Sequence, residues 1–184
     1  MRLRWSHCVL YVRELEKMLA FYQSVLGFEV TDRGPMIAGS EDSPELCFLS
    51  QVGSEHHQIA FANVRGEGAS TTLDHVAFRV DSLADIKALW ERLKENHEQT
   101  GHDAKPAPIT HGNTWSVYFE DPEQNRIEIF CDSPFHVNQP QISPFDITAD
   151  EKDLREWTAS TFRSEPGFTR QEEFLRANRE RFGE

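Results

Sequence analysis

Two histidines and one glutamate have the types and the spacing to bind one divalent metal ion. Residues 6 to 12, SHCVLYV, recur in pattern at residues 74 to 80, DHVAFRV, so that His75 lies 68 positions after His7. The same offset relates Glu128, in the apolar run IEIF, to Ala60, whose methyl group cannot bind a metal. The repeat therefore predicts three protein ligands, His7, His75 and Glu128.

The chemistry of this ligand set is that of an open metal site. Two imidazoles and one carboxylate on one side of an ion leave the other side free, as in non-haem Fe(II) oxygenases that hold substrate and O₂ together. A single histidine in a strand is more often a hydrogen-bonded core residue than a ligand. The repeat symmetry, and the cost of an unpaired carboxylate in an apolar strand, favour the metal. We expect Fe(II).

Two equivalent strands must position the histidines. Both segments are rich in β-branched and aromatic residues, and alternation puts each histidine on the face opposite to an apolar row. After the first strand, apolar residues follow helical spacing from 15 to 26, and Gly27 stands where a helix ends. After the second, Ser82 and Asp85 form a capping pair that predicts a helix start. The order strand, then helix, is thus repeated.

The rest of each half predicts three more strands. The candidates are 28–32, 45–52 and 57–64 in the first half and 107–110, 114–120 and 126–131 in the second, with a turn at 121–125. We therefore predict an α+β fold in which two tandem βαβββ modules, 5–64 and 73–132, form a cupped mixed sheet around the metal site.

Domain organisation follows from composition. The modules and their linker at 65–72 would make one domain, residues 1–134, and a helical C-terminal extension would follow at 135–184 with a break near Glu165-Pro166-Gly167. This tail carries apolar residues that a free tail does not need, so we expect at least a homodimer. They include Trp157, Phe162, Phe174 and Leu175.

Charge and cysteine usage exclude several function classes. The formal net charge of −12 disfavours binding to nucleic acid or an anionic membrane surface. No signal-like run opens the chain and no apolar stretch is long enough to span a membrane, so we expect a cytoplasmic protein. Cys8, Cys47 and Cys131 are widely spaced and lie in apolar stretches, which indicates buried thiols without a chemical role.

The motifs of residues 5 to 132 resemble the vicinal oxygen chelate superfamily, which includes glyoxalase I, fosfomycin-resistance thiol transferases, bleomycin-binding proteins and type I extradiol dioxygenases. The stretch HHQIAF at 56–61 looks like the dioxygenase segment whose second histidine, here His57, acts as acid and base toward dioxygen. The segment from His111 through Tyr118 to Glu128 resembles the one in which a histidine and a tyrosine contact the catechol oxygens. Among dioxygenases, one pair of modules matches only the smaller, one-domain members.

The resemblance implies extradiol cleavage of a catechol-type aromatic diol by O₂ at Fe(II). An imidazole, with a pKa near 6.5, suits the proton transfers that ring opening requires, which would give His57 and His111 their roles. Non-catalytic roles stay open for all three residues. Alternation in a regular strand puts His57 on the face opposite to Ala60, unless a bulge or a strand start redirects it. Tyr118 could be a half-buried strand aromatic, and His111 could be a loop residue.

Two other function classes also remain open. A glyoxalase-like isomerase or thiol transferase would use Zn, Ni or Mn, and the resemblance implies a fourth, carboxylate ligand where Ala60 stands, with Gln58 as the only nearby substitute. A non-catalytic protein could sequester a small aromatic compound in the same cleft. The loops at 33–45 and 98–108 would shape specificity, and the sequence gives them no chemical label.

Overall fold

The computed structural model describes residues 4–37, 39–40 and 42–183. The described residues do not include Met1 to Leu3, which belong to the opening stretch expected to carry no signal. They also do not include Ala38 and Glu41, in the 33–45 loop, or Glu184. The chain divides into two compact units, which we describe separately. Unit 1 comprises residues 1–74 and 121–125, and unit 2 comprises residues 75–120 and 126–184.

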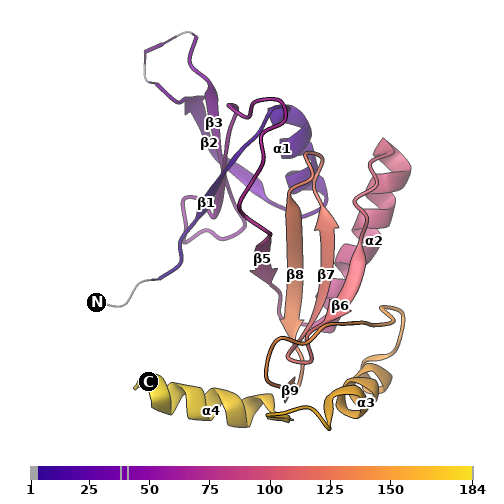
Figure 1. The fold of residues 1–184 in the computed structure, drawn as a ribbon. Helices are drawn as coiled ribbons and strands as arrows, with labels where there is room; N and C mark the ends of the chain where they lie inside the picture. The colour runs from indigo at the N-terminus through magenta and orange to yellow at the C-terminus, as the bar shows by residue number, and fades with distance from the viewer. Residues whose placement is uncertain (1–3, 38, 41, 184) are drawn as a thin grey trace. The chain divides into compact units, whose positions relative to one another are not determined.

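Unit 1 has the predicted order of one strand, one helix and three strands (Figure 1). These elements are β1 (Cys8–Tyr11), α1 (Leu15–Ser24), β2 (Glu29–Pro35), β3 (Glu45–Ser50) and β4 (Ile59–Ala62). The sheet order is β1-β4-β3-β2, with β1 parallel to β4 and the other pairs antiparallel. The first module is therefore confirmed as βαβββ.

The core of unit 1 forms between α1 and one face of the sheet. Leu10, Ile59 and Leu49 alternate with residues of the opposite face and are buried. The ring of Tyr22 on α1 meets the ring of Phe61 on β4 edge-on, with centroids 4.8 Å apart. Gly27 has a φ of 77° and Phe28 N–H donates to the carbonyl of Tyr22, so this glycine ends the helix as predicted.

The predicted turn at Asp121–Asn125 belongs to unit 1. The carboxylate of Glu123, which is almost fully buried, accepts the backbone N–H of Arg13 at 2.5 Å and that of Glu14 at 2.8 Å. The guanidinium of Arg65 lies 3.3 Å from the same carboxylate. Because α1 has no side-chain cap of its own, Glu123 supplies an anion to the N-terminus of that helix from a distant part of the sequence.

Unit 2 repeats the same order. Its elements are β5 (Val76–Arg79), α2 (Leu83–Thr100), β6 (Ala107–Thr110), β7 (Thr114–Glu120) and β8 (Arg126–Asp132). Ser82 and Asp85 form the predicted reciprocal capping box at the start of α2, which packs on β7 and β8. β5 pairs in parallel with β8, and these strands lie in the order β6-β7-β8-β5.

The C-terminal extension clusters with unit 2 and contains more than helices. It consists of β9 (Phe135–His136), β10 (Ser143–Pro144), α3 (Glu151–Phe162), β11 (Thr169–Arg170) and α4 (Gln171–Phe182). The indole N–H of Trp115 donates to Thr158 Oγ1 at 3.0 Å, and Leu154 and Phe162 are buried. The sequence did not predict the three short strands, of which β10 extends the main sheet of unit 2.

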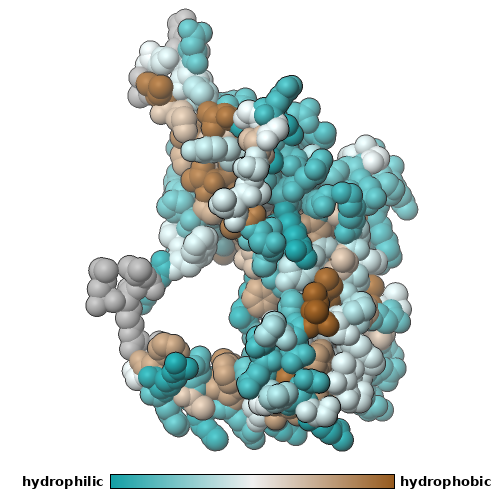
Figure 2. Space-filling model, viewed as in Figure 1, coloured by the Kyte–Doolittle hydropathy of each residue, from teal (hydrophilic) through white to brown (hydrophobic). Residues whose placement is uncertain are grey.

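Surface properties complete the description of the fold. Brown, apolar atoms gather in Figure 2 over the part of unit 1 that holds β1, β2 and β3 in Figure 1. The exposed large hydrophobic residues of β1 and β2 are Val9, Tyr11 and Val30. Within the described residues, no helix is long and apolar enough to cross a membrane. Cys47 and Cys131 are buried and Cys8 is half-buried, and all three are free thiols.

Candidate functional site

His75 and Glu128 meet on one face of the unit 2 sheet. β5 and β8 pair so that Ala77 lies opposite Glu128, and His75 shares the face of Ala77 because side chains alternate. His75 Nε2 lies 3.3 Å from Glu128 Oε2. The neighbours of Glu128 on β8, Ile127 and Ile129, are buried on the opposite face. The alternation of side chains along β8 thus places the carboxylate of Glu128 on the face that also carries His75.

Ser116 fixes the orientation of that carboxylate. Its hydroxyl donates to Glu128 Oε1 at 2.7 Å, and both side chains are buried. One carboxylate oxygen is therefore held by the protein, while the other faces His75. Ser116 was not predicted from the sequence, although its position two residues before Tyr118 in a strand places both side chains on one face.

His111 and Tyr118 form a second pair on the same face of unit 2. His111 Nδ1 lies 2.6 Å from the backbone carbonyl oxygen of Gln141, which can only accept, so Nδ1 carries the proton. His111 Nε2 is then the acceptor of the neutral ring, and the hydroxyl of Tyr118 donates to it at 3.0 Å. The ring of Tyr118 also meets that of His75 edge-on, with centroids 5.5 Å apart. The carbonyl of Gln141, in the C-terminal extension, was not predicted.

His7 and His57 come together in unit 1. β4 begins at Ile59, so His57 lies before the strand. The alternation of side chains along β4 therefore does not fix the direction of the His57 side chain. Its ring centroid is 4.2 Å from that of His7 and 5.0 Å from that of Phe48. Burial, followed by the neighbouring His7 and His56, lowers the pKa of His57, which favours a neutral imidazole at neutral pH.

The donor atoms in unit 2 fit two ligands of one divalent ion. Ligands about 2.1 Å from an ion and at right angles to each other have donor atoms about 3.0 Å apart, close to the separation of His75 and Glu128. The third expected ligand, His7, belongs to unit 1. No group of three or more histidine, cysteine, aspartate and glutamate side chains that could hold a metal is present in the described part of the chain.

The position related to Glu128 by the repeat is occupied as expected by a residue that cannot bind a metal. Ala60 is fully buried in β4, opposite Val9 on β1 and Phe48 on β3. The nearby alternative, Gln58, uses its side-chain oxygen to accept the N–H of Gln51 at 2.9 Å. Neither residue presents a free oxygen ligand in unit 1.

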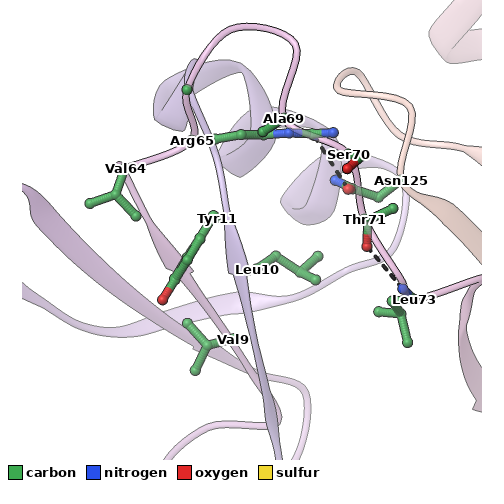
Figure 3. Close-up of a pocket in the computed structure, with 11 residues that line it drawn as sticks. Val9, Leu10, Tyr11, Val64, Arg65, Ala69, Ser70, Thr71, Leu73 and Asn125 are labelled. Carbon is green, nitrogen blue, oxygen red and sulfur yellow. Dashed lines mark hydrogen bonds between the residues drawn. The ribbon is translucent and has the colours of Figure 1, made fainter.

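A pocket of about 440 Å³ also lies in unit 1, between β1 and the 65–73 segment (Figure 3). Figure 3 shows Val9 and Tyr11 on one side of β1 and Leu10 on the other, with Arg65 directed toward Asn125. None of the candidate ligands or catalytic residues lines this pocket. The pocket therefore carries no argument about the chemistry of the histidines.

Comparisons with known proteins place these residues in a family. The chain is 30% identical over 136 residues to biphenyl-2,3-diol 1,2-dioxygenase 3 of Rhodococcus globerulus, a match that covers 71% of this chain and 64% of the relative. It is 31% identical over 144 residues to lactoylglutathione lyase of Neisseria meningitidis serogroup B, with 68% and 88% covered. The chain thus spans just under two thirds of the dioxygenase that it matches.

A solved structure supports the fold. The fosfomycin resistance protein FosX from Listeria monocytogenes, complexed with Mn(II) and sulfate ion, superposes with a TM-score of 0.52 at 21% identity, over 71% of this chain and 93% of that chain. At this identity the likeness concerns the fold alone. The family model of the Glyoxalase/Bleomycin resistance protein/Dioxygenase superfamily matches residues 4–129, and the chain belongs to this superfamily.

Proposed function

We propose that the protein is an Fe(II)-dependent extradiol dioxygenase that cleaves a catechol-type aromatic diol with O₂. The observation that carries the proposal is the hydrogen-bonded pair of Tyr118 and His111 on the same sheet face as His75 and Glu128. A phenol and an imidazole beside two proposed metal ligands suit a substrate that presents two adjacent hydroxyl groups. The likeness to a biphenyl-2,3-diol dioxygenase supports this substrate class.

His7, His75 and Glu128 are the proposed ligands of the metal. A bound Fe(II) would bring the diol and O₂ together and allow electrons to pass between them. Nitrogen and carboxylate donors of this kind also accept Mn, Zn and Ni, so the metal must be identified by reconstitution. Ser116 would keep Glu128 in one orientation, which is the usual task of a hydrogen-bond partner behind a ligand.

Tyr118 and His111 can take a proton from the substrate. Because the Tyr118 hydroxyl donates to His111 Nε2, its oxygen would act as the acceptor toward a substrate hydroxyl. Movement of the substrate proton to Tyr118 can then accompany movement of the tyrosine proton to His111. The Gln141 carbonyl stabilises the resulting imidazolium by keeping its bond to Nδ1–H.

His57 has the second proton-transfer role in the proposal. It is a neutral imidazole beside the proposed ligand His7, and its pKa is lowered chiefly by burial. A neutral imidazole can accept a proton and return it, which ring opening with O₂ requires. Phe48 packs edge-on against its ring and limits the positions that it can take.

Oxygen uptake by anaerobically Fe(II)-loaded protein tests the proposed function. We expect O₂ consumption and a coloured ring-opened product with at least one catechol of a panel, and little uptake with Mn, Zn or Ni in place of iron. Protein without added metal is the control. Iron-loaded protein that binds one metal per chain but consumes no O₂ with any catechol would refute the proposal.

Variants test the ligand set. His7→Ala, His75→Ala and Glu128→Ala should each remove most metal binding, measured as metal content after gel filtration. Glu128→Gln should also be severe, because it removes the charge that offsets the ion. A variant that kept normal metal affinity and turnover would take its residue out of the ligand set.

A second candidate is a glyoxalase-like isomerase or thiol transferase, which the likeness to lactoylglutathione lyase favours. The buried methyl group of Ala60 and the engaged side chain of Gln58 disfavour a fourth ligand in unit 1. Zn- or Ni-loaded protein that isomerised a hemithioacetal of glutathione would support this candidate. Tight binding of aromatic compounds by metal-free protein without turnover would instead support a binding protein.

We also propose that the chain forms a homodimer or a higher homo-oligomer. The α4 helix has no fully buried residue, Trp157 and Phe174 are half-buried, and Phe182 is 60% exposed. Association would cover this apolar surface. Light scattering at working concentration measures the mass directly, and a monomer would contradict the proposal.

A further inference from the structure

His56, next to the proposed proton-transfer residue, has a polar neighbour on each side, His57 and the carboxylate of Asp32. His56 Nδ1 lies 3.0 Å from His57 Nδ1, and His56 Nε2 lies 3.8 Å from Asp32 Oδ2. The other carboxylate oxygen, Asp32 Oδ1, accepts the backbone N–H of Arg33 at 2.8 Å. Phe48 meets both imidazole rings edge-on. Asp32, His56 and His57 therefore lie in a row within unit 1, in which the hydrogen bond between the two histidines is the close contact.

The contact between the two histidines requires a definite proton arrangement. A hydrogen bond between two Nδ1 atoms needs one N–H and one lone pair. A neutral imidazole has one of each, and the nitrogen that carries the proton is set by the partner of the other nitrogen. The carboxylate of Asp32 attracts an N–H at His56 Nε2, which leaves His56 Nδ1 as the lone pair. His57 must then donate from Nδ1, so its Nε2 becomes the free base.

We infer that His56 is a positioning residue that, with Asp32, holds His57 in the Nδ1–H tautomer. The inference rests on the proposed function for its catalytic meaning, because a free Nε2 on His57 is what a base toward substrate or O₂ would use. In water an imidazole prefers the opposite tautomer, with the proton on Nε2. The row of three residues thus imposes a state that His57 would not adopt by itself.

Water competes for this row, which limits the size of the effect. The side chains of His56 and Asp32 are 57% and 66% exposed, so the attraction between them is screened. The direct contact of His56 with His57 should accordingly matter more than the contribution of Asp32. Asp32→Asn should reduce the population of the Nδ1–H tautomer in part, and loss of the acceptor on His56 should reverse the preference.

Nitrogen NMR of ¹⁵N-histidine-labelled, metal-free full-length protein at about pH 8 tests the inference without any turnover. His57→Gln assigns the signals. His56→Phe keeps a ring against Phe48 but removes the acceptor, whereas His56→Asn keeps an oxygen near the position of Nδ1. We expect the Nδ1–H tautomer at His57 in the wild type and in His56→Asn, and the Nε2–H tautomer in His56→Phe. His97→Phe, the same change on α2, should leave the His57 signals unchanged.

Kinetics then separate positioning from the proposed reaction. In iron-loaded protein, kcat for a good catechol should fall about tenfold in His56→Phe, less than loss of a whole acid–base group would cost, with KM and iron content nearly unchanged. His56→Asn should recover most of that loss. Wild-type protein with His57 as Nε2–H, or a His56→Phe variant with an unchanged tautomer, would overturn the inference. A shifted tautomer with unchanged kcat would overturn its role in catalysis, whereas the expected tautomers in a protein that cleaves no catechol would refute the proposed function alone.

Discussion

Replacing Ser116 with alanine tests whether a buried hydroxyl prepares Glu128 for metal binding. In the structure Ser116 Oγ donates to Glu128 Oε1 at 2.7 Å, while Glu128 Oε2 faces His75 at 3.3 Å. Ser116→Ala removes one oxygen atom from a fully buried site and leaves every proposed ligand in place. The variant therefore changes the preparation of the carboxylate without changing the ligand set.

The expected loss follows from the kind of bond removed. A hydrogen bond to a charged group contributes about 1.5 to 3 kcal/mol, and a residue that orients a metal ligand typically contributes about tenfold to a hundredfold in metal affinity. These two estimates agree, because tenfold to a hundredfold corresponds to about 1.4 to 2.7 kcal/mol. We expect a metal Kd raised by about tenfold or more, with the fold retained.

Calorimetric titration with Mn(II), which avoids oxidation, measures the affinity, and an anaerobic titration with Fe(II) repeats the measurement for the proposed metal. Ser160→Ala is the matched control, because this hydroxyl donates to the carbonyl of Trp157 on the surface of α3. Equal metal affinity in wild type, Ser116→Ala and Ser160→Ala would refute the reasoning. It would mean either that Glu128 binds no metal or that its orientation is set by other contacts.

Four further outcomes are expected. His57→Phe should leave the metal content intact and lower catechol turnover about a hundredfold to ten-thousandfold, whereas Tyr118→Phe should lower turnover less. Steady-state kinetics with iron quantified in each variant measure both effects. Wild-type turnover by His57→Phe would contradict the role assigned to His57. Glu123→Gln should destabilise the fold by about 3 kcal/mol, because a charge that holds two backbone N–H groups and a guanidinium is lost, and urea unfolding measures this. Burial raises the pKa of Cys131 to about 12, so at pH 8 only about one Cys131 thiol in ten thousand is ionised. A thiol reagent should therefore modify the half-buried Cys8 before Cys131. Rapid labelling of Cys131 in folded protein would contradict this.

The sequence predicted the architecture because two regular signals agreed. Alternation in the strands and helical spacing between them gave the βαβββ order twice, and the repeat of His7 and His75 aligned the two halves. The strands of the C-terminal extension could not be predicted, since each has only two residues and alternation needs more. Their pairing depends on tertiary contacts that leave no local pattern.

The sequence indicated the side chains of the candidate site, but it did not indicate all of the contacts that support them. The repeat pointed to His75 and Glu128, which the structure brings within 3.3 Å of each other. The Gln141 carbonyl that sets the tautomer of His111 is a backbone group, so the type of residue at position 141 does not indicate it. His57 lies before the first residue of β4, so the alternation of that strand does not determine its direction. The exact first residue of a strand is the feature that sequence patterns predict least well.

The placement of the Asp121–Asn125 turn in unit 1 has a consequence for dividing the protein into fragments. A cut in the 65–72 linker would separate the two sequence repeats, but the first fragment would lack Glu123. The N–H groups of Arg13 and Glu14 and the guanidinium of Arg65 would then lose their shared anion. The repeating unit of the sequence thus differs from the compact unit of the structure, and a first fragment should gain stability when a segment carrying residues 121–125 is added back.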